Sequence, residues 1–521
     1  MDAAHRRPLR PTLAVAPMID VTDRHFRMLI RCISPLPIVY SEMTWDRAIL
    51  YNSPGEPEHQ EGQKNLFTRS IESIIGFCEE EHPIVLQLGG SNPEPLARAA
   101  RIGAARGYDE INLNCGCPAQ TRGRSRNNYG ARLMKEPEVV ASCCAAMRTA
   151  LDDAGHADVA VTVKCRLGVD SRDSYEELVQ FVRTVAAAGV QHFIVHARKA
   201  ILGLNTTQNR SVPPLRHEWV RRLMADFPHL TFTLNGGVGS GVEGGHCDAI
   251  DQAAALLQSG FAGVMLGRRA NAEPYLFARA GALFSLEAGP SRREVLDKYL
   301  AYCARAERAN WDDNSVEGCA RALITPLTGL LHNTVGGPRW RQALTKLMQD
   351  RAALQSGEGV PALVRRCLGA LSLPDGLLDE RPSLRLCPPP KAHSAARATS
   401  ERDAPTVDSP GGVAIADADG DGESECCGGG RGGGRGDAAD SLSLELLPGG
   451  VATSAIPQQA VRRRDGKGDE LMDALDEQAK SSHRRRQAVC IALGALCGAV
   501  ALTAILRQRR IPMQAVAAAR S

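Results

Sequence analysis

The stretch Glu110-Ile-Asn-Leu-Asn-Cys-Gly-Cys-Pro118 reads as a short buried strand that runs directly into a tight turn. Apolar and polar residues alternate up to Asn114, and a glycine and a proline then force a bend. A cysteine is buried as core filling more often than most residues. A thiol on the turn after a strand, however, lies where α/β enzymes keep reactive groups. We therefore interpret Cys117 as a functional residue.

Outward from this strand, short apolar runs alternate with amphipathic helical patterns between residues 11 and 286. The runs are 13–16, 38–40, 84–88, 110–114, 159–164, 192–196, 231–235 and 263–266. Helical patterns between them include 93–107, 174–189 and 248–260, most of which end at a glycine that can cap a helix. Eight strands alternating with helices over roughly 250 residues predict a (β/α)8 barrel, with an open doubly wound sheet as the alternative.

Polar or conformationally special residues stand at the end of every run. They are Pro17 and Met18, Glu42, Gln87, Asn114 with Cys117, Lys164, His196 with Arg198, Asn235-Gly236-Gly237, and Gly267-Arg268. One such residue carries little weight, because a single histidine is usually a satisfied core residue and a single lysine is usually solvated. In a barrel, however, all eight strand ends meet at the carboxyl-terminal rim, where active sites lie. We therefore expect one site at that rim.

The last two strand ends indicate a phosphate site. Asn235-Gly-Gly237 and Gly267-Arg268 follow the seventh and eighth runs, where barrels bind phosphate. Glycines allow backbone N–H groups to approach phosphate oxygens, and an arginine adds bidentate charge. Both segments could be ordinary turns, but their position favours a phosphate-bearing ligand.

Motifs of a known family occur in order along the chain. They are Val15-Ala-Pro-Met18, Asp23-Arg-His-Phe-Arg27, Tyr40-Ser-Glu-Met43, Val85-Leu-Gln-Leu-Gly-Gly90, Gly107-Tyr-Asp-Glu-Ile-Asn-Leu-Asn114, Gly116-Cys-Pro118, Val161-Thr-Val-Lys164, Val195-His-Ala-Arg-Lys199, Leu234-Asn-Gly-Gly237 and Gly263-Val-Met-Leu-Gly-Arg268. From about residue 11 to residue 373, the chain resembles the tRNA-dihydrouridine synthases, and within them the A-type enzymes.

The resemblance implies a fold and a reaction. The fold is an FMN-binding (β/α)8 barrel over 11–286, followed by a small helical tRNA-binding domain over 291–373. NADPH reduces the flavin, a hydride passes from flavin N5 to uracil C6, and the residue that matches Cys117 protonates C5. The substrate is a uridine in the tRNA D-loop, U20 or U20a for A-type enzymes. A uracil in folded tRNA must be extruded to reach a flavin at the bottom of a cup.

The resemblance also implies roles for individual residues. The flavin site consists of Pro17, Met18, Ile19, Gln87, Lys164, His196, Asn235, Gly236, Gly237, Gly267 and Arg268. Gln87 bonds the pyrimidine edge of the flavin, and Lys164 supplies positive charge to the reduced ring. The contacts with tRNA come from Asn114, Arg198, Lys199 and Arg210, of which Asn114 positions the uracil.

The region 291–373 is helical by pattern and rich in arginine, which suits phosphate binding. The residues concerned are Arg292, Arg293, Arg321, Arg339, Arg341, Arg365 and Arg366. The alternative is an ordinary solvated helical surface. The chain reads Thr325-Pro326 where A-type members commonly read Arg-His. This departure leaves the tRNA contacts of the helical region open.

Two further regions follow. Residues 388–482 are rich in Gly, Asp, Arg, Ser and Pro and predict a disordered linker, because they cannot bury enough apolar surface to fold. Residues 488–506 are an apolar run without charge, just long enough for a bilayer span of roughly 20 residues. We expect a C-terminal membrane anchor with the catalytic domain facing the cytosol. The alternative is a soluble alanine-rich helix.

Composition limits other possibilities. A net charge of +3 says little about partners, and 521 residues are too many for one domain. The 16 cysteines lack paired spacing and are expected to be reduced thiols. No second pair accompanies Cys115 and Cys117, so no metal site is expected. We expect a monomer. The alternative functions are a small-molecule flavin oxidoreductase of the dihydroorotate dehydrogenase type and a non-catalytic, membrane-tethered tRNA-binding protein.

Overall fold

The computed structural model describes residues 12–58, 70–118, 129–239, 248–284, 286–311 and 315–386. The chain divides into two compact units, 1–401 and 402–521, and every described residue lies in the first unit. The expected linker at 388–482 and the expected membrane span at 488–506 fall outside the described residues. In the part that is described, no helix is long and apolar enough to cross a membrane.

Eight parallel strands form one sheet in the order β1-β8-β7-β6-β5-β4-β3-β2. Their bounds are β1 Thr12–Val15, β2 Val39–Trp45, β3 Ile84–Gly89, β4 Glu110–Cys115, β5 Ala160–Arg166, β6 His192–His196, β7 Thr231–Asn235 and β8 Gly263–Leu266. β1 pairs with β8 along its whole length. The sheet closes because Val15 N donates to Ile38 O at 2.9 Å, just before β2. The predicted (β/α)8 barrel is therefore confirmed.

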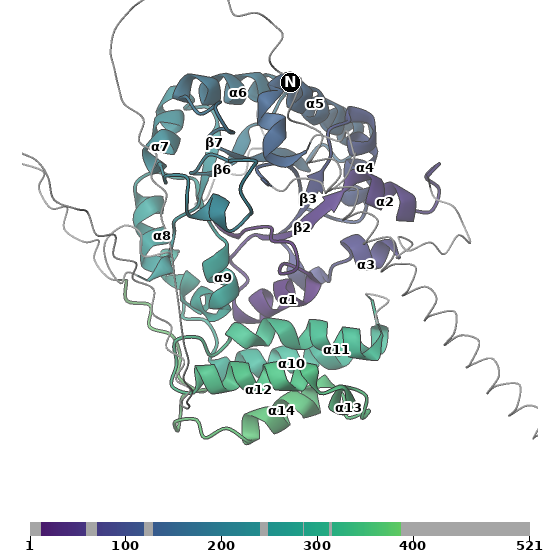
Figure 1. Cartoon of the computed structure of the whole chain (residues 1–521), viewed down its shortest axis with the longest axis vertical. Coiled ribbons are helices and arrows are strands. Elements are labelled where there is room, and N and C mark those ends of the chain that lie inside the picture. The colour runs from purple at the N-terminus through teal and green to yellow at the C-terminus, as the bar shows by residue number, and fades with distance from the viewer. Residues whose placement is uncertain are drawn as a thin grey trace, which may run out of the picture. The chain divides into compact units, whose positions relative to one another are not determined.

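Helices connect successive strands and surround the barrel (Figure 1). They are α1 Arg24–Ile33, α2 Asp46–Asn52, α3 Ile71–Ile75, α4 Pro93–Ala105, α5 Pro137–Asp153, α6 Tyr175–Ala187, α7 His217–Asp226 and α8 Ala249–Gln258, with the short α9 Arg268–Ala272 and η4 Pro274–Leu283 after β8. Five of them, α1, α3, α4, α6 and α8, begin after a residue whose side chain accepts from a backbone N–H of the first turn. The Ser174 hydroxyl, for example, accepts from Glu177 N, and the Glu177 carboxylate accepts from Ser174 N, which completes a capping box.

The second strand differs from the sequence prediction. The apolar run ends at Tyr40, but β2 continues to Trp45, with a shift of its register against β3 between Tyr40 and Met43. Glu42 therefore lies within the strand and not after its end, as the pattern suggested. The reason is that backbone pairing with β3 resumes at Met43, although the side chains at Ser41 and Glu42 are polar.

Side chains of each strand alternate between the helices and the barrel interior. In β4, Ile111, Leu113 and Cys115 belong to the large core between sheet and helices. A separate apolar cluster fills part of the barrel interior and consists of Ala14, Ala16, Tyr40, Val85, Ile194 and Met265. The other β4 residues face this interior and are polar, which makes the inside of the barrel apolar on one side and polar on the other.

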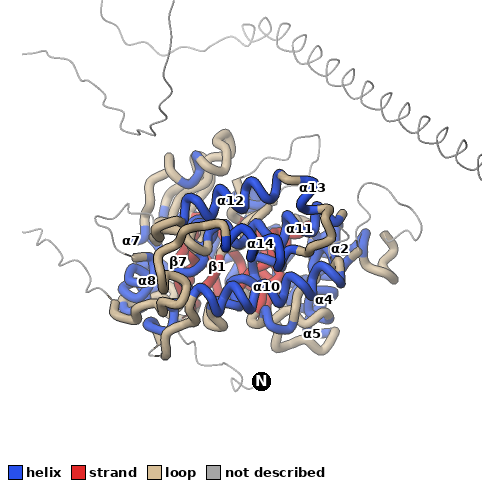
Figure 2. Tube along the Cα trace, turned by 90° about the horizontal axis from the view of Figure 1, so that it is seen from below, coloured by secondary structure: helices blue, strands red, loops and turns tan. Residues whose placement is uncertain are grey.

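A helical region follows the barrel and contains α10 Arg292–Ala309, α11 Val316–Ile324, η5 Thr325–Gly329, α12 Gly337–Gln349, α13 Arg351–Leu354 and α14 Val360–Gly369 (Figure 2). It packs on α1, where His25 Nδ1 lies 2.7 Å from the Tyr302 hydroxyl. The Arg24 guanidinium lies 5.3 Å from the centre of the Trp311 ring. Helix α1 therefore contacts both the barrel and the helical region.

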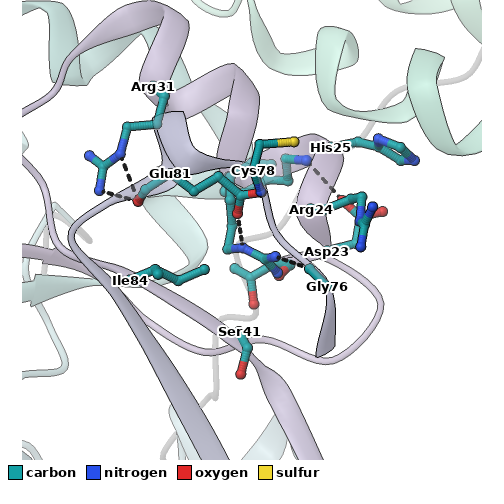
Figure 3. A network of polar contacts seen from close by, with 12 residues as sticks. Asp23, Arg24, His25, Arg31, Ser41, Gly76, Cys78, Glu81 and Ile84 are labelled. Carbon is teal, nitrogen blue, oxygen red and sulfur yellow. Dashed lines mark hydrogen bonds and ion pairs between the residues drawn. The ribbon is translucent and has the colours of Figure 1, made fainter. Parts of the chain in front are cut away.

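A buried ion pair also holds α1 in place (Figure 3). Arg27 Nε lies 2.5 Å from Glu81 Oε2, and both side chains are almost fully buried. Arg27 Nη1 also donates to Thr22 O at 2.8 Å, and Glu81 Oε1 accepts from Cys78 N at 2.8 Å. A buried pair is tolerated only when its remaining hydrogen-bonding groups are satisfied, as they are here. The pair fixes the end of the loop that leads from β1 into α1.

Candidate functional site

A cavity of about 720 Å³ opens at the carboxyl-terminal ends of the strands. It is lined by residues from all eight strands or from the loops that directly follow them. The candidate residues on its wall are Pro17, Met18, Ile19, Gln87, Asn114, Cys117, Lys164, His196, Arg198, Arg210, Asn235, Gly236, Gly237, Gly267 and Arg268. The structure thus brings together at one rim residues that are more than 250 positions apart in the chain.

Lys199 is the candidate residue that the structure does not place on this wall. Its ammonium lies 2.6 Å from the Asp173 carboxylate and 3.3 Å from Asp170 O. The ion pair with Asp173 neutralises the charge of Lys199. Glu42 is likewise absent from the wall, and its carboxylate accepts from Asp20 N.

The turn that carries Cys117 is held by hydrogen bonds to its backbone. Asn114 Oδ1 accepts from Gly116 N at 3.0 Å and from Cys117 N at 2.9 Å. Arg166 Nε donates to Gly116 O at 2.9 Å, and Cys117 O accepts from Ala131 N at 2.8 Å. The partly exposed thiol at 117 therefore stands on a fixed backbone, as a group that must meet a substrate atom requires.

Lys164 projects from β5 into the same cavity. Its Nζ donates to Asn235 Oδ1 at 3.1 Å, and Asn235 Nδ2 donates to Met265 O at 2.8 Å. Burial, and secondarily the charge of Arg166, lowers the pKa of Lys164 to about 8. Lys164 is therefore mainly a cation at neutral pH, but it loses its proton more easily than an exposed lysine.

Gly236 and Gly237 form a cradle that a side chain would fill. Both adopt left-handed backbone angles, with φ of +96° and +80°. A Cβ atom on Gly236 would lie 2.5 Å from His196 Cδ2, and one on Gly237 would lie 2.4 Å from a methyl of Leu215. The sequence therefore needs glycine here for conformation and for space. Both glycines line the cavity, at the turn where the sequence predicts a phosphate site.

Positive charge accumulates on the wall of the cavity. The residues are Lys164, Arg166, Arg198, Arg210 and Arg268. Within the described ranges, none of these five forms an ion pair with a carboxylate, whereas a sixth cation on the wall, Arg269, pairs with Glu273. The Nε atoms of Arg210 and Arg269 are buried there without a hydrogen-bond partner. Burial, together with these cations, holds the pKa of His196 well below its usual range. A site with so much uncompensated charge is suited to an anion, such as the phosphates of a nucleotide or of RNA.

Arg166 is a wall residue that the sequence analysis did not select. It is almost fully buried, and its Nη1 donates to Lys199 O at 3.1 Å and to Asn209 O at 3.0 Å. Together with its bond to Gly116 O, these contacts join the loops after β4 and β6. The signal in the sequence is the spacing: Arg166 lies two positions after Lys164 and therefore on the same face of β5.

Four of the seven arginines that the sequence analysis selected in the helical region form ion pairs. Ion pairs join Arg293 to Asp379, Arg321 to Glu317, Arg365 to Asp297 and Arg366 to Glu358. In the described part of the chain, no carboxylate pairs with Arg339 or Arg341 at the start of α12, and Arg341 contacts His332 Nδ1 at 3.0 Å. The departure Thr325-Pro326 lies at the start of η5, next to α9 at the cavity wall. Thr325 is exposed and Pro326 is buried.

Residues 14–363 match the family model described as dihydrouridine synthase (Dus). The chain belongs to the dihydrouridine synthase family. The match runs through the barrel and nearly to the end of α14, and it confirms the resemblance seen in the motifs. In the described part of the chain, no group of three or more His, Cys, Asp or Glu side chains could hold a metal ion.

Several relatives of this Dus chain carry the name tRNA-dihydrouridine(20/20a) synthase. The protein from Synechocystis sp. is 39% identical over 369 residues, which cover 70% of this chain and 96% of the relative. The protein from Shewanella oneidensis is 39% identical over 338 residues, 64% of this chain and 88% of the relative. The protein from Pseudomonas aeruginosa is 41% identical over 336 residues, with the same two shares, 64% and 88%.

Proposed function

We propose that this chain is a tRNA-dihydrouridine synthase that uses FMN and NADPH to reduce a D-loop uridine, at position 20 or 20a, to 5,6-dihydrouridine. One observation carries the proposal: in a member of the Dus family, a thiol on a fixed turn and a glycine cradle share one cavity with uncompensated cations. The names of the relatives support the substrate and the positions.

The residues of the cavity fit FMN. Unpaired cations and the cradle at Gly236 and Gly237 suit its phosphate, and the Gln87 carboxamide suits a pyrimidine edge. When bound, FMN supplies the hydride that uracil C6 receives. Lys164, which is mainly protonated at neutral pH, places positive charge beside the site, where it favours the anionic reduced state.

Cys117 is the residue we assign to the proton. A positioned side chain can deliver a proton only from within hydrogen-bond reach, so its backbone must be held. The Asn114 carboxamide holds the backbone of Cys117, and Arg166 holds the preceding carbonyl. In this arrangement, Cys117 Sγ gives its proton to uracil C5. Asn114 also lies on the wall, where its remaining amide hydrogen can meet the uracil edge.

Electrostatic attraction between arginines and phosphates dominates the binding of tRNA in this proposal. Arg198 and Arg210 lie on the cavity wall, and Arg339 and Arg341 begin α12 in the helical region. Basic side chains of this kind serve phosphates and make binding dependent on salt. The extruded uridine enters the cavity while the rest of the tRNA stays outside it.

The composition of the chain outside the described residues supports a further proposal on location. Residues 488–506 anchor the protein in a membrane, residues 388–482 form the linker, and the catalytic domain faces the cytosol. We propose that the enzyme acts as a monomer.

The test uses purified full-length protein and tRNA that lacks dihydrouridine. The protein is expected to be yellow, to release FMN on denaturation and to be bleached by NADPH. Mapping of the tRNA is expected to find dihydrouridine at position 20 or 20a. A protein that carries FAD or no flavin would overturn the cofactor assignment. Reduction of free pyrimidines without tRNA would favour the dihydroorotate type of enzyme, and flavin-free binding of tRNA would favour a non-catalytic protein.

A further inference from the structure

One side of the barrel interior is polar, although barrel interiors are usually filled by branched apolar side chains. Strand β4 directs Glu110, Asn112 and Asn114 inward, and its neighbours β3 and β5 add Gln87 and Thr162. All except Glu110 are at most 8% exposed, and Glu110 is partly covered at the opposite end of the strand from Cys117. Burying polar groups is costly unless each is hydrogen-bonded, so their partners decide what this side of the barrel does.

These five side chains form one continuous series of hydrogen bonds. Asn114 Nδ2 donates to Gln87 Oε1 at 2.7 Å, and Gln87 Nε2 donates to Asn112 Oδ1 at 2.8 Å. Asn112 Nδ2 donates to Thr162 Oγ1 at 2.8 Å, and the Thr162 hydroxyl donates to Glu110 Oε1 at 2.6 Å. We call this series the amide chain. It runs along the barrel interior from the cavity to the far end of β4.

Both ends of the amide chain require every hydrogen bond in it to be donated in the same direction, from the cavity toward Glu110. At the cavity, Asn114 Oδ1 accepts from two backbone N–H groups, those of Gly116 and Cys117. At the far end, Glu110 Oε1 accepts from the Thr162 hydroxyl and, at 3.4 Å, from the Tyr40 hydroxyl. Above about pH 7 the Glu110 carboxyl is mostly ionised and can only accept, which fixes this direction. Turning one carboxamide around would set N–H against N–H and oxygen against oxygen. Bonds that all point one way also polarise and strengthen one another.

We propose that Glu110, which does not line the cavity, is a positioning residue that fixes the orientation of the Gln87 and Asn114 carboxamides through the amide chain. The inference rests on the proposed function, in which Gln87 meets the flavin and Asn114 meets the uracil. Gln87 uses one N–H and one oxygen lone pair within the chain, and it has one of each left for a pyrimidine edge. The amide chain therefore decides whether the free N–H or the free oxygen lone pair of Gln87 faces a given atom of the flavin.

A pair of matched threonines makes the proposal testable. Thr162 and Thr233 are both inside the barrel and at most 2% exposed. Thr162 links Asn112 to Glu110, whereas the Thr233 hydroxyl lies 2.8 Å from His192 Nε2, outside the amide chain. Thr162→Val breaks the chain with little change of shape, Thr162→Ser keeps its hydroxyl, and Thr233→Val removes a comparable buried hydroxyl elsewhere.

The measurements are the FMN dissociation constant and the absorbance maximum of bound FMN, on full-length protein at about pH 8, where the Glu110 carboxyl is mostly ionised. Thr162→Val is expected to weaken FMN binding about tenfold, because a Gln87 that is no longer oriented loses one buried hydrogen bond to the flavin, and to shift the absorbance maximum. Thr162→Ser is expected to restore both values, and Thr233→Val to stay within about twofold of wild type. Glu110→Gln keeps an acceptor but adds a donor, so it is expected to shift the maximum in the same direction as Thr162→Val. Wild-type values for Thr162→Val, or equal effects of both valine variants, would overturn the proposal.

A readout without flavin separates this inference from the proposed function. In the flavin-free protein, Gln87→Met and Thr162→Val are expected to be non-additive in the free energy of unfolding, because both partners bond to Asn112. Gln87→Met and Thr233→Val are expected to add. A wild-type protein that takes up no FMN would refute the proposed function. The double-variant comparison would still show whether the amide chain couples Gln87 to Thr162. Additivity of the first pair would refute the amide chain itself.

Discussion

Two cysteines that are two positions apart have opposite environments. Cys115 is fully buried in the core between β4 and the helices, where burial raises the pKa of its thiol far above the ordinary value. Cys117 lies past the end of the same strand, on the cavity wall, and is partly exposed. The end of the strand separates them, because a residue on the turn no longer follows the alternation that points Cys115 into the core. Position, and not residue type, makes one thiol available to a substrate.

Replacing each cysteine in turn tests this assignment. Cys117→Ala is expected to retain FMN and bleaching by NADPH but to reduce uridine in tRNA about 10²–10⁴-fold more slowly, the usual effect of losing a positioned acid. Cys115→Ala is the matched control and is expected to keep nearly full activity. The measurement is single-turnover formation of dihydrouridine by pre-reduced enzyme. Opposite behaviour of the two variants would show that the turn is misplaced.

Glu110 makes stability depend on pH. Burial raises the pKa of this carboxyl from an ordinary value of 4.5 to about 7, although bonds from Thr162 and Tyr40 oppose the rise. The charge of Asp109 nearby raises the pKa further. The folded protein therefore binds this proton more tightly than the unfolded chain. Its contribution to stability is complete below about pH 4.5 and is lost as the pH rises through 7.

The expected result is a free energy of unfolding that falls between pH 5 and 8 for wild type relative to Glu110→Gln. The loss is expected to be roughly 3 kcal/mol, since each unit of pKa shift corresponds to about 1.4 kcal/mol. Urea unfolding at a series of pH values measures it. Parallel curves for the two proteins would mean that Glu110 keeps an ordinary pKa in the folded state.

At the scale of elements, each side chain at the rim owes its place to the strand or turn that carries it. The turn after β7 shows this most directly, because Gly236 combines a φ of +96° with a close approach to His196. Gly189, which follows α6, has a φ of +93°, but a Cβ atom added there would meet no heavy atom within 4 Å. The two glycines therefore share a backbone conformation and differ in their surroundings.

Alanine substitutions at both positions separate conformation from space. Gly189→Ala is expected to lower the free energy of unfolding by roughly 1–2 kcal/mol, the cost of a left-handed backbone for alanine, and to leave FMN binding unchanged. Gly236→Ala is expected to cost more and to weaken FMN binding at least tenfold, because the methyl group displaces His196. Thermal unfolding and flavin titration measure the two effects. Equal FMN affinity in both variants would argue against a cofactor at this turn.

Much of this element-level arrangement could be predicted from sequence. Apolar runs predicted the strands because buried parallel strands have few polar interruptions, and Gly236 and Arg268 stood out at the ends of two of them. The predicted end of the second strand was wrong, because Ser41 and Glu42 interrupt the apolar run while the backbone of β2 continues to pair with β3. The role of Arg166 and the amide chain could not be predicted, because their partners come from different strands and meet only after the barrel has closed.

At the scale of the whole molecule, the described part joins the barrel to the helical region through α1. His25 and Arg24 on α1 contact Tyr302 and Trp311, and Arg305 on α10 lies 2.8 Å from Glu80. These contacts cross between segments that are more than 200 positions apart in the sequence. In the function proposed above, the surface that meets tRNA includes both the barrel rim and α12, and the contacts of α1 hold the helical region against the barrel.

The proposed membrane anchor belongs to the same scale, because it concerns location and not chemistry. A flexible linker of the length of 388–482 reaches several tens of Å, on the order of 5–6 Å × √n, so an anchored barrel remains free to meet tRNA. Deletion of 488–521 is expected to move the protein from the membrane pellet to the soluble fraction without changing its turnover on tRNA. Fractionation of cells and an assay of both proteins measure this.

A salt wash provides the control for this prediction. Basic residues flank 488–506 and could hold protein on anionic lipid by charge alone, and that portion is expected to wash off with high salt. A true span resists both salt and alkaline carbonate. Extraction of the full-length protein by carbonate would show that 488–506 does not cross the membrane.

The pairing of β1 with β8 has a consequence for how the protein is made. Thr12 lies opposite Gly263, so the first strand of the barrel must wait for the last before the ring can close. Contacts over such a separation form late, because a long loop must be ordered before they contribute. Pro17 and Arg268, on opposite sides of this seam, belong to the same cavity wall. During synthesis on the ribosome, a chain released before β8 has emerged lacks the part of the cavity wall that Met265 and Arg268 supply, and we expect capture of the proposed FMN to begin only when the ring is complete.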